Sequence, residues 1–200
     1  MPKVVDHARR REEIARLAVA VIGQEGAEGA TVRRIAQAGG FSFGVLTHYF
    51  RDKDELIAFA FQWVATRTFA DLNDAVDAAE PGLARLRTAL EFMMPAPGAN
   101  SFMEVWLGLW DRAIRNPDLA RIHRAYYARW RRCVQRHLGE AVARGQIPPP
   151  RSQGDATDLL VAGVDGLWIG AAFEPRRYTR RRRAQLTQRL LVGILGAQPA

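Results

Sequence analysis

The sequence predicts an all-α fold, and three observations support that prediction. Apolar residues recur at helical spacing through most of the 200 residues, without a useful stretch of the alternation that marks a β-strand. Glycines and prolines gather between the apolar stretches, where they end helices. Residues that cap helices stand at the expected starts, as Thr31 does before one short apolar stretch.

The helices can be placed in order from these signals. Gly23 and Gly26 are expected to end a first helix that begins at Ala8. Asp52 caps a helix after the two short ones, and Glu55 three residues later approximates a capping box. After the first, the expected helices span 32–38, 43–49, 53–77, 81–94, 101–116, 117–144, 155–173 and 185–195.

Charge and cysteine content narrow the class of protein. Lys and Arg number 29 against 21 Asp and Glu, a net charge of +8, which favours a polyanionic partner. The alternative is that an arginine-rich genome raises the net charge without any functional meaning. The single cysteine, Cys133, excludes an internal disulfide and suits a reducing compartment. No run approaches the roughly 20 apolar residues of a membrane span, so we expect a cytoplasmic protein without a membrane partner.

The stretch from Thr31 to Leu56 predicts a helix-turn-helix followed at once by another helix. Ile35 on the first short helix and Leu46 on the second are expected to face the core and fix the angle between them. Gly39 and Gly40 are expected to provide the positive φ of a tight turn. In this motif one helix braces and the next enters the major groove. The sequence therefore predicts that the protein binds double-stranded DNA.

The outward positions of the expected reading helix are Phe43, Gly44, Thr47 and His48. Phe43 and Thr47 suit a thymine methyl group, and no Arg, Asn or Gln stands between residues 42 and 50 to reach a base edge. We expect base recognition that is partly apolar and partly through DNA shape. Further readout is expected from Arg33 or from basic residues near the start of the chain, namely Lys3, Arg9, Arg10 and Arg11.

Phosphate contacts are expected at the ends of the same helices. The hydroxyls of Thr31, Ser42 and Tyr49 can donate to phosphates, as can the backbone N–H groups at helix starts. Lys53 at the start of the following helix supplies an ammonium group. Such contacts set the register of the protein on the duplex.

A family pattern runs through this stretch as Thr31…Ile35-Ala36…Gly40-Phe41-Ser42…Gly44…Leu46…His48-Tyr49-Phe50…Asp52-Lys53…Leu56. It resembles the N-terminal DNA-binding domain of the TetR family of transcriptional regulators over roughly Glu13 to Phe61. Gly39 stands where the family usually has Ala, and Phe41 stands where it has a small aliphatic residue, which is expected to shift the reading helix slightly. The resemblance implies phosphate contacts for Thr31, Ser42, Tyr49 and Lys53, and it implies that Phe43, Val45 and Thr47 lie near bases. With Arg33, Gly44 and His48, which the residue pattern itself suggests, these form the candidate DNA-binding set.

The second half carries a weaker resemblance. Trp106…Leu109-Trp110…Pro117…Leu119 and Asp165-Gly166-Leu167-Trp168 are similar to the ligand domain of the betaine-pathway (BetI-like) repressors. The resemblance implies a repressor released from its operator by a small-molecule effector, with choline as the archetype. An apolar effector of an unrelated pathway is the alternative. The expected domains are residues 1–53, a three-helix DNA-binding domain, and residues 54–200, a helical effector-binding and dimerisation domain.

The residues themselves allow a cation site, because aromatic rings and a carboxylate suit a quaternary ammonium. Trp106 and Trp110 are one helical turn apart and share a face. Plain core packing explains these tryptophans at least as well. The candidate effector pocket comprises Phe102, Trp106, Trp110, Asp111, Tyr126, Asp165 and Trp168.

A homodimer is expected, since a helix-turn-helix generally reads two half-sites. Small residues on the helix 155–173 and a leucine-rich stripe on 185–195 suit a four-helix interface, although both can also complete the core of one chain. The candidate interface residues are Gly163, Gly166, Leu167, Gly170, Leu186, Leu190 and Ile194.

Rival interpretations find less support. A helical enzyme would use His123, His137 or Cys133, but nothing in the sequence gathers them into a site. Cys133 and His137 are spaced as two metal ligands without a third, so we expect no metal and no cofactor. The arginine run 176–183 is expected to be a solvated loop between helices, with a membrane-surface role as the alternative.

Overall fold

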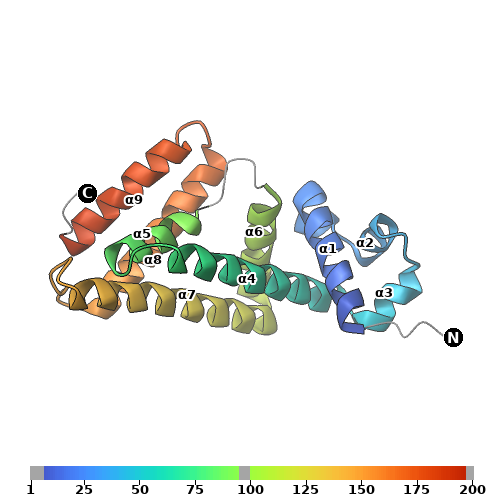
Figure 1. Cartoon of the computed structure of the whole chain (residues 1–200). Helices are drawn as coiled ribbons and strands as arrows, with labels where there is room; N and C mark the ends of the chain where they lie inside the picture. Colours follow the sequence, from blue (N-terminus) through green and yellow to red (C-terminus); the bar gives the residue numbers. More distant parts are fainter. Residues whose placement is uncertain (1–6, 95–99, 197–200) are drawn as a thin grey trace. The chain divides into compact units, whose positions relative to one another are not determined.

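Helices make up most of the part of the chain that the structure describes, and short turns and loops join them (Figure 1). The computed structural model describes residues 7–94 and 100–196, with side chains in the second range from residue 105. Within these ranges no strand is present, which confirms the all-α prediction. The helices are α1 (His7–Gly29), α2 (Val32–Ala38), α3 (Phe43–Tyr49), α4 (Lys53–Asp77), α5 (Leu83–Phe92), α6 (Asn100–Arg115), α7 (Pro117–Ala143), α8 (Gln153–Phe173) and α9 (Arg180–Leu195).

The helices form two compact units. The first comprises Met1–Thr68 and Ala99–Arg124, and the second comprises Phe69–Gly98 and Ala125–Ala200. Helices α4 and α7 therefore each contribute one part to each unit. This division by packing differs from the expected division by function after residue 53, which stays a prediction.

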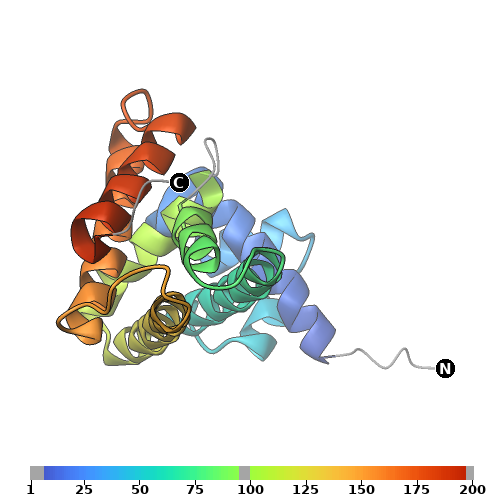
Figure 2. The ribbon, with the colours of Figure 1, turned by 60° about the vertical axis from the view of Figure 1, so that its left-hand side comes forward.

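The first unit has its core along the apolar face of α1. Ile14, Ala18 and Val21 of α1 are buried, as are Ile35 of α2 and Leu46 of α3. Helix α2 lies against both α1 and α3, as Figure 2 shows from a second direction. The short helices are thus braced by buried apolar side chains, Ile35 and Ala36 in α2 and Leu46 in α3.

Helix α1 is longer than expected. It continues past Gly23 and departs from helical geometry only at Gly26, where φ is 73° and ψ is 169°. The predicted end is wrong at Gly23, because a glycine inside a helix costs only about 1 kcal/mol and the surrounding apolar face offsets it, whereas the break predicted at Gly26 is present as a kink. The kink at Gly26 needs glycine, since its φ lies in the left-handed region.

Caps fix the starts of the helices that follow. The Thr31 hydroxyl accepts from the backbone N–H of Arg34 at 3.1 Å, and the Asp52 carboxylate accepts from that of Glu55 at 2.7 Å. Ser42 occupies the N-cap of α3 but makes no capping hydrogen bond through its side chain. The capping box is incomplete, because the Glu55 carboxylate accepts instead from the backbone N–H of Arg51 at 2.9 Å.

The two glycines of the turn between α2 and α3 have different tasks. Gly40 has a φ of 66°, in the left-handed region that favours glycine, as expected. Gly39 has a φ of −95°, which any residue adopts, so the expectation of a positive φ there is wrong. The backbone therefore demands glycine at one of these two positions only.

Helix α6 packs against α1 within the first unit. A Cβ on Gly108 would lie 2.5 Å from the Cβ of Ala27, so only glycine allows this close approach. The Trp106 indole of α6 meets the Phe61 ring edge-on, with centroids 4.6 Å apart. Because Phe61 lies on α4, α6 is anchored to both long helices of the unit.

The second unit contains the whole of α5, α8 and α9, together with the C-terminal parts of α4 and α7. Its buried side chains include Trp130 of α7, Leu160 and Val164 of α8, and Leu191 of α9. Helices α8 and α9 lie side by side in both views (Figure 2). An 18-residue stretch of helix α8 has a mean hydropathy of 1.4, so the helix is by length and composition apolar enough to cross a membrane, unlike what the sequence led us to expect. Packing against α9 and α5 gives its apolar residues another explanation.

The arginine run is only partly a loop. Residues 176–178 lie in the turn before α9, but Arg180 begins the helix and Thr179 caps it, accepting from the N–H of Arg182 at 3.3 Å. The expected start at residue 185 is therefore wrong. Thr179 was an available signal for the start of this helix. It was overlooked because the first turn contains no apolar residue that would show helical periodicity.

Candidate DNA-reading surface and effector site

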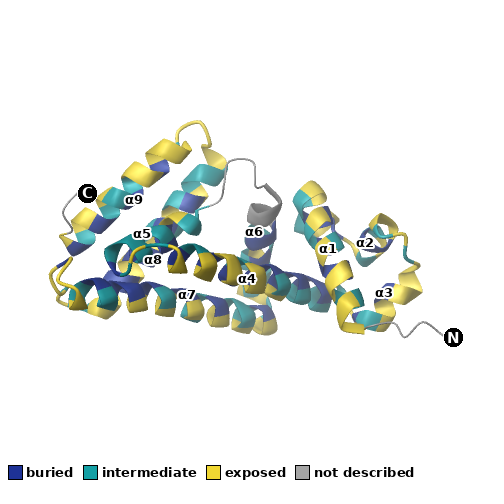
Figure 3. Cartoon of the chain, viewed as in Figure 1, coloured by how far each residue is buried: buried dark blue, intermediate teal, exposed yellow. Residues whose placement is uncertain are grey.

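Helix α3 turns one face to the core and the other to solvent. Leu46 is fully buried, whereas Phe43 is 52% exposed and Val45 is 38% exposed. Figure 3 shows α3 mostly in the colour of exposed residues. Two large apolar side chains exposed on a helix of seven residues indicate a surface that is covered in use.

Other members of the predicted reading set share this face. Gly44 is exposed, and a Cβ there would meet nothing within 4 Å. The Thr47 hydroxyl donates to the carbonyl of Gly44 at 3.0 Å, so its hydrogen is used within the helix and its methyl group is the part left for an apolar contact. Ser42 and His48 are also exposed.

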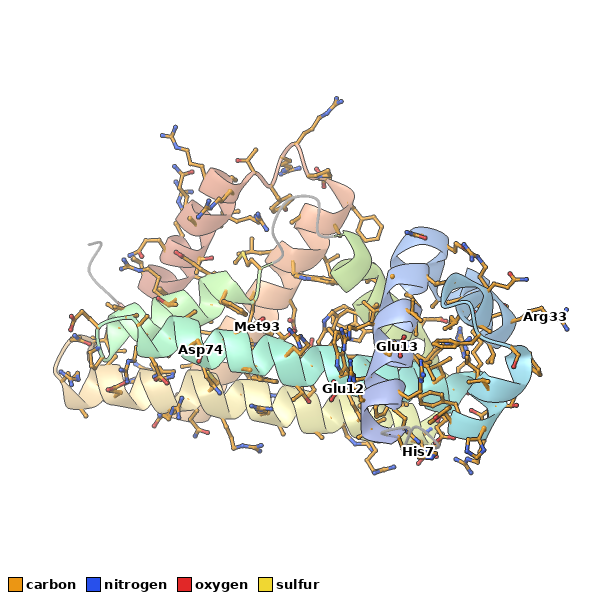
Figure 4. The ribbon with its side chains drawn as sticks, turned by 45° about the vertical axis from the view of Figure 1, so that its right-hand side comes forward. His7, Glu12, Glu13, Arg33, Asp74 and Met93 are labelled. Carbon is orange, nitrogen blue, oxygen red and sulfur yellow. The ribbon has the colours of Figure 1, made fainter. Side chains whose placement is uncertain are left out.

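The phosphate candidates lie around α3. Thr31 and Arg33 are exposed at the start of α2, and Arg33 projects away from the helix in Figure 4. Tyr49 is half-buried in a group of three rings, with centroids 5.2 Å from that of His7 and 5.4 Å from that of His48.

Lys53 is more restrained than the sequence suggests. Its ammonium donates to the backbone carbonyl of Glu28 at 3.0 Å. Burial, followed by the positive charge of Arg112, lowers the pKa of Lys53 below its usual value, and Glu28 and Asp54 oppose that effect. An ammonium has three N–H donors, so two remain for a phosphate.

Arg11 has a structural role that the sequence did not reveal. Its guanidinium donates to the carbonyl of Tyr49 at 3.1 Å and lies 4.6 Å from the ring centroids of both Phe50 and Phe59. It also pairs with Glu55 at 3.6 Å. The guanidinium of Arg11 thus holds the end of α3, and its part in reading DNA stays a prediction. Lys3, another candidate near the chain start, lies outside the described residues.

A polar network joins α6 to the helices next to the reading surface. The Arg112 guanidinium pairs with Asp54 at the start of α4 and with Glu28 near the end of α1, the latter at 3.3 Å. The Asn116 amide donates to the other oxygen of Asp54 at 3.1 Å. Lys53 therefore lies beside a cluster of charges in which α6 takes part.

The candidate effector residues divide between the two units. In the first unit, Trp106 is buried and Trp110 is half-buried, edge-on to His123 at 6.3 Å between centroids. Asp111 is exposed and pairs with Arg115 one turn later, so its carboxylate takes part in a surface ion pair. The Phe102 side chain lies outside the described residues.

The effector candidates of the second unit lie around a carboxylate–aromatic cluster, by which we mean Asp165 with Tyr126 and Tyr127. The Tyr127 hydroxyl donates to the Asp165 carboxylate at 2.9 Å, and Trp168 follows one turn later on α8, buried. The Tyr126 and Tyr127 centroids are 5.9 Å apart. Sequence reasoning missed Tyr127, although its place beside Tyr126 was the available signal.

The electrostatics of this cluster are set by burial. Burial raises the pKa of Asp165 to about 6, and the hydrogen bond from Tyr127 and the charge of Arg131 only partly oppose it. Burial and the neighbouring Asp165 raise the pKa of Tyr127 as well. The cluster therefore holds a carboxylate whose ionised form lacks sufficient positive charge nearby, which a cation would supply.

The expected interface glycines are partly explained within one chain. A Cβ on Gly163 would lie 2.8 Å from Cδ1 of Leu190, and one on Gly170 would lie 2.7 Å from Cζ of Tyr178. Gly166, in contrast, is exposed with nothing within 4 Å. Leu167, Leu186 and Ile194 are half-buried, as is Leu190.

The rival catalytic groups do not form a site. His137 is buried, with its ring nitrogens 3.3 Å from the Glu140 carboxylate and 3.2 Å from the Arg136 guanidinium. Burial raises the pKa of the Cys133 thiol, which makes it a poorer nucleophile. No group of three or more potential metal ligands occurs among the described residues.

A capped brace, a tight turn and a short helix with an exposed face define a helix-turn-helix DNA-binding protein. Residues 14–59 match the model of the tetR family of bacterial regulatory proteins, and residues 82–196 match that of the C-terminal region of BetI-type transcriptional repressors. The chain belongs to the tetR family of transcriptional regulators, with a C-terminal region of the BetI type.

Individual relatives cover nearly the whole chain. The HTH-type transcriptional regulator PksA of Bacillus subtilis (strain 168) is 33% identical over 91% of this chain and 88% of its own. The HTH-type transcriptional regulator BetI 1 of Chromohalobacter salexigens is 29% identical over 93% and 90%.

Solved structures agree with the fold. A putative transcriptional regulator from Pseudomonas aeruginosa PAO1 has a TM-score of 0.81 at 25% identity, covering 96% of this chain and 92% of that one. A putative transcriptional regulator from Saccharomonospora viridis in complex with choline has a TM-score of 0.87 at 19% identity, covering 96% and 100%. The second likeness shows the fold alone.

Proposed function

We propose that this regulator is a cytoplasmic, homodimeric repressor that binds a two-fold-symmetric operator through α3 and is released by a small cation. The observation that carries the DNA-binding part is the exposed face of α3, held by capped helices on both sides. The expected functional domains, residues 1–53 and 54–200, belong to this proposal.

In the operator complex, short side chains of α3 read bases. Phe43, Val45 and Thr47 present apolar groups that fit thymine methyls. Thr31, Ser42, Tyr49 and Lys53 bind phosphates around them, and Arg33 adds a longer reach. Gly44 allows the backbone to approach the groove closely, and His48 lies at its edge.

The dimer would use an exposed stripe on α8. Leu159 is 58% exposed, Ile169 is 39% exposed and Phe173 is 73% exposed. With Ala162 and Gly166, also exposed, they recur at alternating spacings of three and four residues and so share one face. A second copy related by two-fold symmetry would cover this face. Of the expected interface set, Gly166 belongs to this stripe, whereas Gly163 and Gly170 face Leu190 and Tyr178 of the same chain. Leu167, Leu186, Leu190 and Ile194 remain part of the proposed interface.

The effector would bind at the carboxylate–aromatic cluster of the second unit. Asp165 supplies a counter-charge, and the rings of Tyr126, Tyr127 and Trp168 supply faces that attract a cation. Support also comes from the BetI-type relatives and from the choline complex of the S. viridis protein. Choline is therefore the first effector to test, and an apolar compound is the alternative.

Selection of duplexes from a random double-stranded library with the full-length protein tests the DNA-binding function. The proposal predicts enrichment of one inverted-repeat sequence, bound with a dissociation constant that rises steeply with salt. Sedimentation analysis of the free protein should give the mass of two chains. If the selection enriches no sequence, the repressor proposal is contradicted. If sedimentation gives the mass of one chain at micromolar concentration, the dimer proposal is contradicted.

A further inference from the structure

The small size of Gly39 is required by its neighbours and not by its backbone. A Cβ at this position would lie 2.5 Å from Cδ1 of Leu17 and 2.6 Å from Cε2 of Phe41, closer than real Cβ contacts. The first of these atoms is the end of a flexible side chain and can yield at little cost. The second belongs to a rigid ring, which must move as a whole.

The Phe41 ring is held on several sides. The Arg10 guanidinium of α1 lies 5.2 Å from its centroid, and Arg10 is in turn paired with Glu13 at 2.8 Å. The backbone N–H of Phe41 donates to the carbonyl of Ala36 in α2 at 2.9 Å. The ring therefore occupies a slot over Gly39, bounded by Leu17 and Arg10 of α1.

This slot adjoins the start of the reading helix. Phe41 immediately precedes Ser42, the N-cap of α3, so a displacement of the ring through its backbone moves the first turn of the helix. The reading side chains Phe43, Val45 and Thr47 lack the long flexible chain by which an arginine could reach further and compensate. A site of this kind tolerates only about 0.5 Å of misplacement.

We propose that Gly39 and Phe41 are a matched pair of positioning residues, which fix α3 against α1 and thereby set the base preference of the protein. The proposal rests on the proposed function, in which α3 reads DNA. Gly39 leaves the slot empty, Phe41 fills it, and Arg10 closes it from outside. Either residue changed alone breaks the match, and a compensating change in both restores it.

A double-mutant cycle tests the match. The proteins are the parent, Gly39→Ala, Phe41→Val and the double variant, in which the new methyl group of residue 39 fills the space that the ring vacates. Each is titrated against the duplex enriched by the parent from a random library, against single-base variants of it and against a scrambled duplex. We expect each single variant to lose about tenfold in affinity for the enriched duplex and the double variant to recover to within about threefold of the parent.

The readouts separate positioning from general damage. The single variants should alter the ranking of the single-base variants, and the scrambled duplex should be bound as by the parent. Gly154→Ala is the matched control, since its Cβ would lie 3.9 Å from Oγ of Ser152 and should leave both affinity and ranking unchanged. Phe41→Leu, a milder change that folds if Phe41→Val does not, should lose about threefold.

Two results would overturn the proposal. One is a double variant whose loss equals the product of the single losses, because that would show two independent defects. The other is an equal loss on enriched and scrambled duplexes, because that would reflect stability or charge. A parent protein that enriches no sequence is a different outcome, since it contradicts the proposed function itself.

Discussion

The DNA-reading surface and the effector site differ in how far apart in sequence their residues lie. The reading surface is formed between Thr31 and Lys53, and its caps, turn and buried side chains are all encoded locally. The effector candidates come from α6, α7 and α8, and they divide between two units. A motif can be recognised from sequence when the residues that hold it in place are close to it in the chain. A pocket whose residues are distant in sequence can be recognised only once the fold is known.

A pair of matched leucine substitutions should separate the two regions most strongly. Leu46 of α3 and Leu160 of α8 are both 0% exposed, so truncation to alanine should cost each about 2–5 kcal/mol of unfolding free energy. Leu46→Ala should also weaken operator binding by about 100-fold or more, because α3 loses its anchor. Titrations at low temperature, with circular dichroism to confirm folding, measure this; equal operator affinity for both variants would contradict the assignment of α3.

Asp165→Asn should stabilise the protein at neutral pH. Burial raises the pKa of Asp165 from 3.8 to about 6, so the folded state binds this proton more tightly than the unfolded state. Stability is therefore lost as pH rises from about 4 to about 6, and a neutral amide avoids that loss. After allowance for partial exposure, we expect a gain of about 2 kcal/mol at pH 7.5 and almost none at pH 4. Urea unfolding at the two pH values measures it, and an equal effect at both would refute it.

Lys53→Ala should weaken DNA binding about evenly across sequences. The ammonium keeps two donors beyond its bond to the Glu28 carbonyl, and these are assigned to a phosphate. Affinity should fall by about fivefold at low salt, and the slope of log affinity against log salt should shrink by about 1. A change in base preference would contradict a phosphate role.

The ion pair of Arg112 with Asp54 should have the smallest effect. Both side chains retain some exposure, at 19% and 44%, so the coupling in a cycle of Arg112→Gln and Asp54→Asn should be about 1 kcal/mol of unfolding free energy. The same single variants should weaken release of DNA by effector, because α6 loses its polar link to α4. Additive stability losses would show that the pair contributes nothing.

Much of the fold followed from the sequence because its signals are short-range. Thr31 and Asp52 cap the helices as predicted, and the bounds of α2 and α3 agree to the residue. Errors arose where local signals were ambiguous. Gly23 looks like a helix end but lies inside α1, and the arginine run hides the cap at Thr179.

The site was predictable to different degrees for the same reason. The exposure of Phe43 follows from helical periodicity, whereas that of Val45 was not among the outward positions predicted. The task of Arg11 depends on Phe50 and Phe59, which lie far along the chain. The partner of Asp165 is Tyr127, and no local spacing relates the two. The slot over Gly39 likewise needs α1 to close it.

Release of the operator by a cation is the central claim, and one titration tests it most directly. The complex with the enriched duplex is titrated at pH 7.5 with choline and, separately, with 3,3-dimethylbutan-1-ol, a neutral compound of the same shape. We predict release by choline alone, loss of that release in Asp165→Asn, and weaker release by choline at pH 5, where Asp165 is largely protonated. Equal release by the two compounds, or release that Asp165→Asn leaves intact, would contradict the claim.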